Sequence, residues 1–327
     1  MIVLSGMRPT GRLHFGHYFG ALKTWLELQK CDQNKCYYMS ADWHALTTDY
    51  ANTSKIHDNI LEMVADWIAV GIDPKKSIIF QQSMVHQHIE LFLILSMFVP
   101  LGWLYRCPTY KDQIKEIKNR NLNNYGFLGY PVLMSADILL YMTDIVPIGE
   151  DQLPHLEFTR DIVKRFNYFY SDNLFHIPNA KLTKTARVLG LDGRKMSKSY
   201  NNTIFLTEDI DTLYQKINKM ITDPTKIKQN DIGHPKICVV FSFIQLFYDK
   251  TKQLNIQNNC EQGLIGCVKC KHLLMEILSE FIKPLNSKRK YLLSDKTYLV
   301  NILKTGSDKA SNIADKTIKR IHKILKF

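Results

Sequence analysis

The segment His14-Phe15-Gly16-His17 places two imidazoles on either side of a glycine near the start of the chain. Gly16 has no Cβ, so a nucleotide could lie against the backbone there. His14 and His17 can donate hydrogen bonds to phosphate oxygens, which carry more charge in a transition state. For this segment alone, two surface histidines in a turn are an open alternative.

A second segment, Lys195-Met196-Ser197-Lys198-Ser199, lies far downstream, after a turn predicted at Asp192-Gly193. Two lysines three positions apart, with hydroxyls between them, can surround a pyrophosphate as point charges and hydrogen-bond donors. A solvated basic loop is the alternative for this pentapeptide taken alone.

Four of the seven cysteines follow the pattern C-x21-C-x6-C-x2-C: Cys238, Cys260, Cys267 and Cys270. Four thiolates can satisfy a tetrahedral Zn²⁺ or a [4Fe–4S] cluster, and unligated cysteines are a third possibility. The other three are scattered and are expected to be ordinary interior residues: Cys31, Cys36 and Cys107.

Alternating apolar runs and amphipathic segments must position these groups. We expect strands at residues 2–4, 36–40, 77–81 and 145–148, and helices at 17–29, 58–70, 135–141 and 153–166. Strands separated by helices predict an α/β fold with a Rossmann-like doubly wound parallel sheet. Ligands of such sheets bind beyond the carboxyl ends of the strands, where free N–H groups of helix N-termini attract phosphate.

Two further stretches are expected to be helical. Residues 90–123 are mostly helical in pattern, and the sequence beyond about residue 205 is almost wholly helical and rich in lysine. The last stretch has basic side chains on one helical face and these residues on the other: Ala310, Ile313, Ala314, Thr317, Ile318, Ile321 and Leu325.

Length and composition narrow the class of protein. The 327 residues suggest about two domains. Lys and Arg number 43 against 31 Asp and Glu, and a formal net charge of +12 favours a polyanionic partner such as nucleic acid or nucleotide phosphate. The most apolar run, 91–104, is too short to span a bilayer, and nothing resembles a signal peptide, so we expect a cytoplasmic protein with no membrane partner.

Taken together, HFGH after the first strand and KMSKS after the sheet resemble the paired signatures of class I aminoacyl-tRNA synthetases. Longer segments narrow the resemblance to the tryptophanyl-tRNA synthetases of bacteria: DWHALT at 42–47, YPVLMSADILLY at 130–141 and DIVPIGEDQLPHLE at 144–157. The similarity runs from residue 2 to about 205 and returns in the C-terminal helix. It implies ATP-dependent activation of L-tryptophan and its transfer to tRNA(Trp).

Indole offers one polar atom, an N–H that only donates, so its pocket needs an apolar slot with one fixed acceptor. The resemblance implies that Asp137 is this acceptor and that Met134, about one helical turn away, lies against the ring. It assigns Tyr130 and Gln152 to the substrate's amino group and His44 to the vicinity of the indole. On pattern alone, Asp137 reads as a helix-surface carboxylate and Met134 as core.

The resemblance also implies an ATP site. It places Gly149, Glu150 and Asp151 on the adenosine and ribose side and Val188 near adenine. The remaining ATP-binding residues it implies are Arg8, Pro9, Thr10, Gly16, His17, Lys195, Met196, Ser197, Lys198 and Ser199. Many bacterial members have Gln where this chain has Arg8, and some have Thr and Asn where it has His14 and His17.

The implied reaction is attack of the tryptophan carboxylate on the α-phosphorus of ATP, with pyrophosphate leaving. We assign catalytic roles to His14, His17, Lys195 and Lys198, and expect Mg²⁺ on the leaving group by analogy with other phosphoryl chemistry. No side chain resembles a covalent nucleophile.

The implied organisation is a Rossmann-type catalytic domain over 1–204 and a helical anticodon-recognition domain over 205–327. A subset of bacterial tryptophanyl-tRNA synthetases has a similar cysteine spacing and binds a [4Fe–4S] cluster, so this cluster is expected, with Zn²⁺ as the alternative. The family forms two-fold dimers, and the apolar region 91–105 agrees with a homodimer.

Three rival functions stay open. A tyrosyl-tRNA synthetase shares the fold, but its pocket would have to pair a hydroxyl with both a donor and an acceptor. A small nucleotidyltransferase shares an HxGH motif but not the KMSKS context. A non-catalytic RNA-binding paralogue would keep the fold and fail to form the aminoacyl-adenylate.

Overall fold

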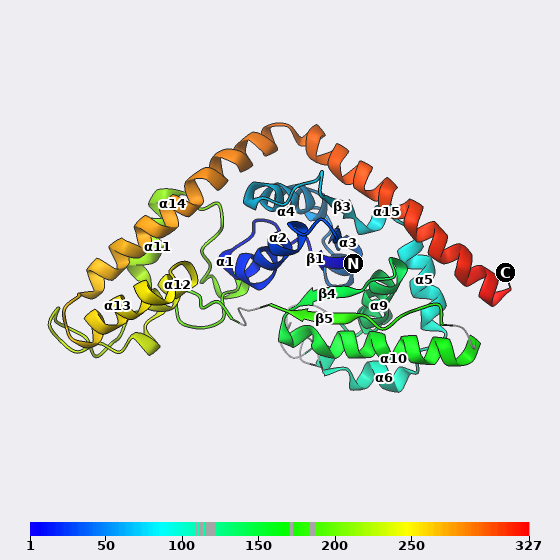
Figure 1. The fold of residues 1–327 in the computed structure, drawn as a ribbon, viewed down its shortest axis with the longest axis horizontal. Coiled ribbons are helices and arrows are strands. Elements are labelled where there is room, and N and C mark those ends of the chain that lie inside the picture. Colours follow the sequence, from blue (N-terminus) through cyan, green and yellow to red (C-terminus); the bar gives the residue numbers. More distant parts are fainter. Residues whose placement is uncertain (109, 112–113, 115–121, 171–172, 184–186, 327) are drawn as a thin grey trace. The chain divides into compact units, whose positions relative to one another are not determined.

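The computed structural model describes residues 1–327 apart from 109, 112–113, 115–121, 171–172, 184–186 and 327 (Figure 1). The chain forms two compact units, each assembled from separate stretches of sequence. Unit 1 consists of Met1–Gly11, Ala21–Lys184 and Leu292–Phe327, and unit 2 consists of Arg12–Gly20 and Thr185–Tyr291. The expected split at residue 204 divides the chain by function, and it stays a prediction.

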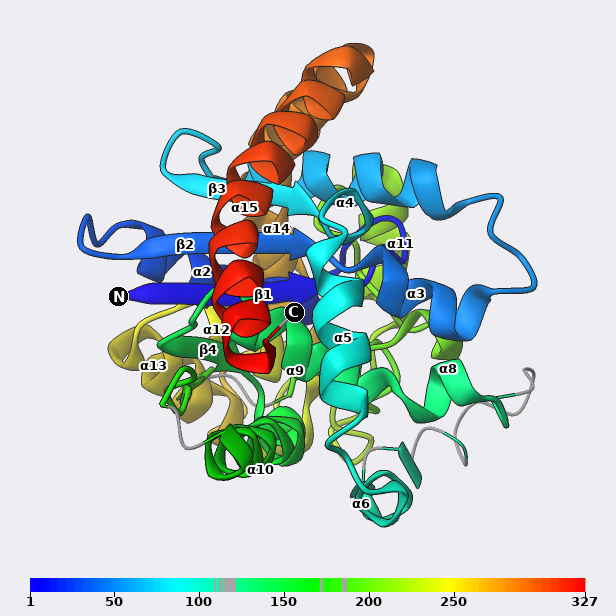
Figure 2. The same cartoon turned by 90° about the vertical axis from the view of Figure 1, so that its right-hand side faces the viewer.

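Unit 1 is built on a five-stranded parallel sheet in the order β3-β2-β1-β4-β5, and Figure 2 shows β3, β2, β1 and β4 side by side. The strand order reverses between β1 and β4, so the doubly wound α/β fold predicted from the sequence is confirmed. The strands are β1 (Ile2–Met7), β2 (Lys35–Ser40), β3 (Ser77–Gln81), β4 (Ile145–Ile148) and β5 (Asn179–Leu182). Strand β5 was not predicted, because this short edge strand is mostly exposed and has no apolar run.

Helices cover both faces of the sheet, so neighbouring residues of a strand are buried on opposite sides. On one face Tyr38 stacks on Trp25 with ring centroids 4.4 Å apart, and Trp67 meets Trp25 edge to face. On the other face Tyr37 stacks on Tyr141 at 5.0 Å. Burial on both sides explains why these strands are nearly continuous apolar runs in the sequence.

The helix that carries most of the candidate tryptophan residues is longer than predicted. The pattern predicts a helix over 135–141, but α9 runs Tyr130–Leu140, because Pro131 lies in the first turn, where a helix needs no N–H partner. Part of the predicted helical stretch 90–123 lies outside the described residues. The helices of unit 1 are α2 (Lys23–Gln29), α3 (Asp42–Asp49), α4 (Ile56–Val70), α5 (Gln87–Ser96), α6 (Leu101–Arg106), α8 (Tyr125–Leu128), α9, α10 (Leu153–Tyr170) and α15 (Lys296–Leu325).

Unit 2 is helical, although less continuously than predicted. Its helices are α1 (Phe15–His17), α11 (Ile210–Lys219), α12 (Val239–Phe247), α13 (Lys250–Glu261) and most of α14 (Cys267–Ser294). The prediction of an almost wholly helical chain beyond residue 205 is wrong for 220–234. There the carboxylates of Asp223 and Asp231 accept backbone N–H groups of nearby residues in turns that compete with a helix. In the part of the chain that the structure describes, no helix is both long and apolar enough to cross a membrane.

The C-terminal helix α15 packs onto the sheet of unit 1 and crosses its face in Figure 2. Its predicted apolar face is confirmed, since Ala310, Ala314, Ile318 and Ile321 are buried in the core. Gly306 approaches β3 so closely that a Cβ there would lie 1.8 Å from the carbonyl oxygen of Ile79. The glycine therefore sets how near the helix can come to the strand.

Replacing this glycine should reverse the usual effect of an alanine in a helix. Alanine favours a helix over glycine by about 1 kcal/mol. In Gly306→Ala, however, the new methyl group would overlap the backbone of β3, so we expect a net loss of about 2 kcal/mol or more in the free energy of unfolding. Denaturant titration would measure it, with Lys304→Ala on the exposed side of α15 as the control. An unchanged or higher midpoint for Gly306→Ala would contradict this contact.

Candidate active site

The predicted ATP-binding residues of unit 1 lie where the strand order reverses. Arg8, Pro9 and Thr10 follow β1, and Gly149, Glu150 and Asp151 follow β4, so both groups leave the carboxyl ends of adjacent parallel strands. Ligands of doubly wound sheets bind at this point of the topology. The two segments therefore lie together at the edge where a nucleotide is expected.

Contacts within unit 1 hold both segments in place. The guanidinium of Arg8 donates to the hydroxyl of Thr48 and lies 3.6 Å from the carboxylate of Asp49. A Cβ on Gly149 would lie 2.6 Å from Oδ1 of Asp151, so the carboxylate packs directly against the glycine. Arg8 thus carries a partly exposed positive charge, and Asp151 an acceptor, at neighbouring strand ends.

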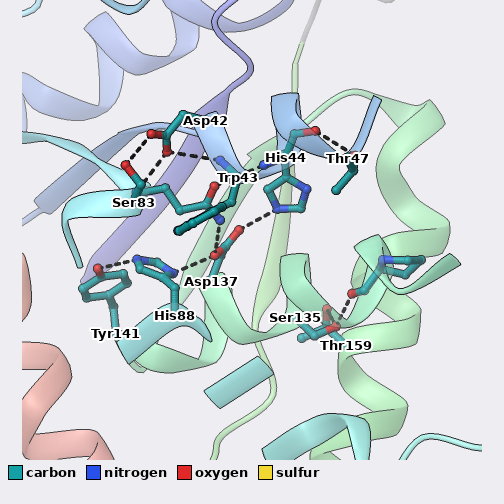
Figure 3. Close-up of polar contacts among 12 residues, drawn as sticks. Asp42, Trp43, His44, Thr47, Ser83, His88, Ser135, Asp137, Tyr141 and Thr159 are labelled. Atoms are coloured by element: carbon teal, nitrogen blue, oxygen red, sulfur yellow. Dashed lines mark hydrogen bonds and ion pairs between the residues drawn. The ribbon is translucent and has the colours of Figure 1, made fainter. Parts of the chain in front are cut away.

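The candidate indole acceptor, Asp137, lies in a dense hydrogen-bond network. The residue is 3% exposed, which rules out a helix-surface carboxylate. Oδ2 lies 2.8 Å from Nε2 of His44, and Oδ1 lies 2.6 Å from Nδ1 of His88 and 2.8 Å from Nε2 of Gln82 (Figure 3). Nε2 of His88 lies 2.8 Å from the hydroxyl of Tyr141. A line of polar groups therefore runs from α3 through Asp137 to the end of α9.

These contacts decide the charge of the carboxyl group. Burial alone would raise the pKa of Asp137, but the charge of His88 and the hydrogen bonds from His44 and His88 outweigh it and lower that pKa. Burial, and then the charge of Asp137, raises the pKa of Tyr141 well above its usual value. Asp137 is therefore an ionised acceptor, and Tyr141 stays protonated.

A carboxylate at the end of β2 positions His44. Asp42 is the first residue of α3, and it accepts hydrogen bonds from the backbone N–H of Ser83 at 2.9 Å and from Nε2 of Gln81 at 2.8 Å. These bonds tie the carboxyl ends of β2 and β3 together, two residues before His44. The helix start, and with it the imidazole, is thereby fixed beside Asp137 (Figure 3).

The other predicted tryptophan residues have separate surroundings. The hydroxyl of Tyr130 lies 3.3 Å from Nε2 of His155, and burial, followed by the charge of His44, lowers the pKa of His155 to about 4. Met134 is partly buried against the core one helical turn before Asp137, and Gln152 donates to Asp151 at 3.0 Å. The structure thus brings His44 and Asp137 into direct contact, while Tyr130 and Gln152 bond to their own neighbours.

In unit 2 the two histidines of HFGH bond to the backbone of their own segment. Nδ1 of His14 accepts the N–H of Gly16 at 3.1 Å, and Nδ1 of His17 accepts the N–H of His14 at 3.2 Å. Burial, followed by the charge of Lys198, lowers the pKa of His14 to about 3. Burial, followed by the charges of His14 and Lys198, also lowers the pKa of His17 well below its usual value. Both rings are therefore neutral and carry their proton on Nε2, which makes each Nε2 a hydrogen-bond donor.

The backbone of HFGH differs from the expectation of free N–H groups. The N–H of Phe15 donates to the carbonyl of Ile204 at 3.1 Å, that of Gly16 to His14, and that of His17 to the carbonyl of His14 at 2.8 Å. The first amides of this helical segment are therefore already bonded within the protein. Any contact to phosphate here must come from the imidazoles rather than from the helix N-terminus.

The KMSKS loop is folded back on itself by Asn202. The amide of Asn202 accepts the N–H of Ser197 at 2.8 Å and donates to the carbonyl of Lys195 at 3.2 Å and to Asp192 at 2.7 Å. The N–H of Met196 donates to the carbonyl of Val188 at 2.9 Å. HFGH and KMSKS lie close together, because the charge of Lys198 acts on both histidines of HFGH.

Several polar residues that bond to these sites were not predicted from the sequence: Gln82, His88, Tyr141, His155 and Asn202. No local pattern points to His88, which lies in the mixed polar and apolar stretch VHQHIEL at 85–91. Asn202 follows KMSKS directly but carries no pattern of its own. The predicted ATP residues themselves divide between Arg8–Thr10 and Gly149–Asp151 in unit 1 and the HFGH, Val188 and KMSKS residues in unit 2.

The four clustered cysteines line one pocket of unit 2, at the start of α12, the end of α13 and the first turn of α14. Burial, followed by the charges of the other three cysteines, raises the pKa of Cys270 to about 12. A Cβ on Gly233 would lie 2.5 Å from Sγ of Cys260, so the glycine leaves room for the thiol. As placed, no three His, Cys, Asp or Glu side chains of the described residues form a group that could hold a metal ion. Elsewhere, Cys36 and Cys107 are buried as expected, whereas Cys31 is exposed.

A separate surface pocket of about 430 Å³ lies in unit 1, and none of the predicted tryptophan-binding residues lines it. Its walls come from α3, α5, α8 and α9 and are mostly apolar: Trp43, Leu46, Thr47, Tyr50, Ile89, Phe92, Asn124, Gly126, Gly129 and Leu133. The pocket therefore belongs to the outer surface of these helices rather than to the Asp137 network.

Comparisons with known proteins agree with this geometry. Residues 1–283 match the family described as tRNA synthetases class I (W and Y). The chain is 43% identical to the tryptophan–tRNA ligase of Thermotoga maritima and 39% identical to that of Aquifex aeolicus, in each case over 99% of both chains. It also matches the solved structure of the tryptophanyl-tRNA synthetase from Campylobacter jejuni complexed with ADP and tryptophan, with a TM-score of 0.89, 36% identity and coverage of 100% of both chains.

The neutral state of His14 should be visible in the pH dependence of stability. Its pKa is about 3 in the folded chain against 6.5 without burial, so the unfolded chain binds more protons between these values. The stabilisation is present above pH 6.5 and is lost as the pH falls toward 3. His14→Asn keeps a side-chain acceptor for the Gly16 N–H but cannot titrate. Its unfolding free energy should therefore fall less between pH 7.5 and pH 5, by on the order of 1–2 kcal/mol.

Chemical denaturation at several pH values would measure this difference, after the offset between the two proteins at pH 7.5 has been subtracted. Parallel profiles for the wild type and His14→Asn would contradict a neutral His14.

Proposed function

The chain belongs to the class I tRNA synthetases of the tryptophan and tyrosine family, and from this premise we propose which of its residues carry out each step. Its activity is that of a tryptophan–tRNA ligase: it activates tryptophan with ATP and charges tRNA with the product. The main support for these residue assignments is that Asp137 is buried, ionised and surrounded by hydrogen-bond donors.

We propose that Asp137 accepts the indole N–H of tryptophan. An ionised carboxylate only accepts hydrogen bonds, which suits an N–H that only donates. Met134 would lie against the ring from the preceding turn of α9, and His44, already bonded to Oδ2, would border the indole. Tyr130 and Gln152 would bind the ammonium group of the substrate.

Roles in ATP binding are proposed for residues of each unit. Gly149, Glu150 and Asp151 would contact the adenosine and ribose, and Val188 the adenine. Arg8 carries a charge that can reach a phosphate, which would replace the amide contact of relatives with Gln. The remaining contacts would come from Pro9, Thr10, Gly16, His17, Lys195, Met196, Ser197, Lys198 and Ser199.

Activation would proceed as a displacement at phosphorus. A carboxylate oxygen of tryptophan forms a bond to the α-phosphorus, and the bond from that phosphorus to the bridging oxygen of the β-phosphate breaks. The Nε2–H groups of neutral His14 and His17 would donate to phosphate oxygens, and Lys195 and Lys198 would neutralise the leaving pyrophosphate. Mg²⁺, carried by the ATP phosphates, would supply further positive charge when bound.

The transfer step would use a terminal ribose hydroxyl of tRNA(Trp) to take the aminoacyl group from the adenylate. We propose that the catalytic functions lie within residues 1–204 and that the helical part over 205–327 recognises the anticodon. The formal charge of +12 supports contact with the tRNA phosphates, which would weaken with salt.

We propose further that Cys238, Cys260, Cys267 and Cys270 hold a [4Fe–4S] cluster, with Zn²⁺ as the alternative. The donor set supports this, because four thiols from three helix ends line one pocket, and Gly233 leaves space beside Cys260. Binding would require the thiols to turn toward one centre. When bound, the cluster would link these helix ends.

We propose that the protein works as a homodimer in the cytoplasm. Large apolar side chains are exposed on α5 and α6 of unit 1, and a mostly apolar pocket lies beside them. Such a surface supports contact with a second copy of the chain. The exposed residues are Ile89, Leu93, Met97, Leu101 and Tyr105.

ATP–pyrophosphate exchange with each of the twenty amino acids tests the substrate and the phosphate-binding residues together. Exchange should depend on tryptophan. Lys195→Ala and Lys198→Ala should each slow it by about 10²–10³-fold, because charge on the transition state is no longer neutralised, while the Kd of tryptophan stays roughly unchanged.

Lys250→Ala, an exposed lysine of α13, is the matched control and should exchange normally. Exchange that depends on tyrosine, or that is absent with every amino acid, would contradict the proposed function. Normal exchange in both loop variants would contradict only their assigned role.

The cluster proposal has a separate test. Protein purified without oxygen should be brown and contain about four iron atoms and four sulfides per chain. Cys267→Ser should lose the colour, whereas Cys31→Ser, at an exposed cysteine of unit 1, should keep it. A colourless protein with one zinc would establish the alternative, and a colourless protein without metal would show that the cysteines are unligated.

A further inference from the structure

His88 is a buried, titratable residue to which none of the proposed steps gives a role. It lies in the first turns of α5, its side chain is fully buried, and it bonds on both sides. Nδ1 lies 2.6 Å from Oδ1 of Asp137, and Nε2 lies 2.8 Å from the hydroxyl of Tyr141 (Figure 3). The imidazole therefore bridges α5 to two positions one helical turn apart on α9.

The direction of the bond to Asp137 follows from the chemistry of the partners. An ionised carboxylate has no proton to donate, so the proton between Asp137 and His88 belongs to Nδ1 of the imidazole. Nε2 shares its hydrogen bond with the hydroxyl of Tyr141. Tyr141 is itself held in place by stacking on Tyr37 at 5.0 Å. The ring of His88 is thus fixed in position, with Nδ1 toward the carboxylate.

This arrangement determines which oxygen of Asp137 is left for a substrate. Oδ1 accepts from His88 and from Gln82 at 2.8 Å, which occupies that oxygen with two donors. Oδ2 accepts from His44, and an oxygen of a carboxylate can accept a second hydrogen bond. A single acceptor position is therefore left for a substrate, on the oxygen shared with His44.

Without His88 the carboxyl group would lose its shortest hydrogen bond and part of the charge that offsets burial. A buried carboxyl group that becomes protonated gains an O–H donor. Such a group would no longer require a donor from the substrate and would also suit a phenolic oxygen. The charge state of Asp137 is therefore a determinant of which aromatic side chain the site prefers.

We propose that His88, oriented by Tyr141, is a positioning residue that keeps Asp137 as a fixed acceptor for the indole N–H and so sets the preference for tryptophan. The proposal rests on the role proposed above for Asp137. It predicts that His88 acts on the N–H of the substrate, and not on binding of the aromatic ring in general.

The test compares tryptophan with its sulfur analogue 3-benzothienylalanine, which has the same bicyclic shape and no N–H. Pyrophosphate exchange gives kcat and KM for each. The wild type should prefer tryptophan. His88→Leu should raise the KM for tryptophan by about tenfold or more and leave that for the analogue nearly unchanged, because only tryptophan uses the acceptor. Tyrosine should become a better substrate relative to tryptophan.

His88→Asn provides the rescue, because its amide can donate to Asp137 from a position near Nδ1, and it should recover most of the preference. Ser135→Ala is the matched control: it removes another buried hydrogen bond of α9, to Thr159 at 2.9 Å, outside the network (Figure 3). It should keep the wild-type preference.

The outcomes separate the two proposals. If Asp137→Leu, which has no acceptor, keeps the wild-type preference for tryptophan, the role of Asp137 fails. If Asp137→Leu loses that preference and His88→Leu keeps it, or loses activity equally toward both substrates, only the role of His88 is overturned. Should His88→Leu fail to fold, Tyr141→Phe replaces it, with the same but smaller shift expected and an unshifted preference counting against the proposal.

Discussion

A carboxylate that is buried away from water stays ionised only while hydrogen-bond donors surround it. Several elements of unit 1 supply such donors to Asp137. Its donors come from α3, α5 and the turn after β3, and they approach the two oxygens from different sides. Buried donors and acceptors discriminate strongly, because a ligand that lacks the matching group leaves one of them without a partner, at a cost of about 1–3 kcal/mol. Selection between aromatic side chains of similar size can thus rest on one oxygen atom.

The parallel sheet is the reason why these groups converge. Arg8, Asp42, Gln82 and Gly149 each follow the carboxyl end of a different strand, so the topology delivers them to one edge although the sequence separates them widely. In unit 2, the candidate phosphate-binding groups are positioned by local hydrogen bonds instead of strand ends. The imidazoles of HFGH accept N–H groups of their own segment at Nδ1, so Nε2 is the donor that each ring has for a ligand.

The parts of the fold and of the candidate site that could be predicted are those that leave a local pattern in the sequence. The strands β1 to β4 and the apolar face of α15 are visible in the sequence because burial imposes periodicity, and the HFGH, KMSKS and Asp137 segments carry recognisable motifs. His88 could not be assigned, since its partners lie 49 and 53 positions away and no local pattern encodes them. The bonded amides of HFGH depend equally on a distant residue, Ile204. The turns that Asp223 and Asp231 form interrupt the stretch beyond residue 205, which the sequence predicts to be almost wholly helical.

The close contact between Gly306 of α15 and Ile79 of β3 has a consequence for how the chain folds during synthesis. The ribosome delivers all five strands long before α15, so the apolar surface of the sheet that receives Ala310 and Ile318 stays uncovered while unit 2 is made. Contacts between such distant parts of a chain form slowly and leave nascent protein open to aggregation. The nascent sheet is therefore a natural client for chaperones that shield apolar surface until the last helix docks.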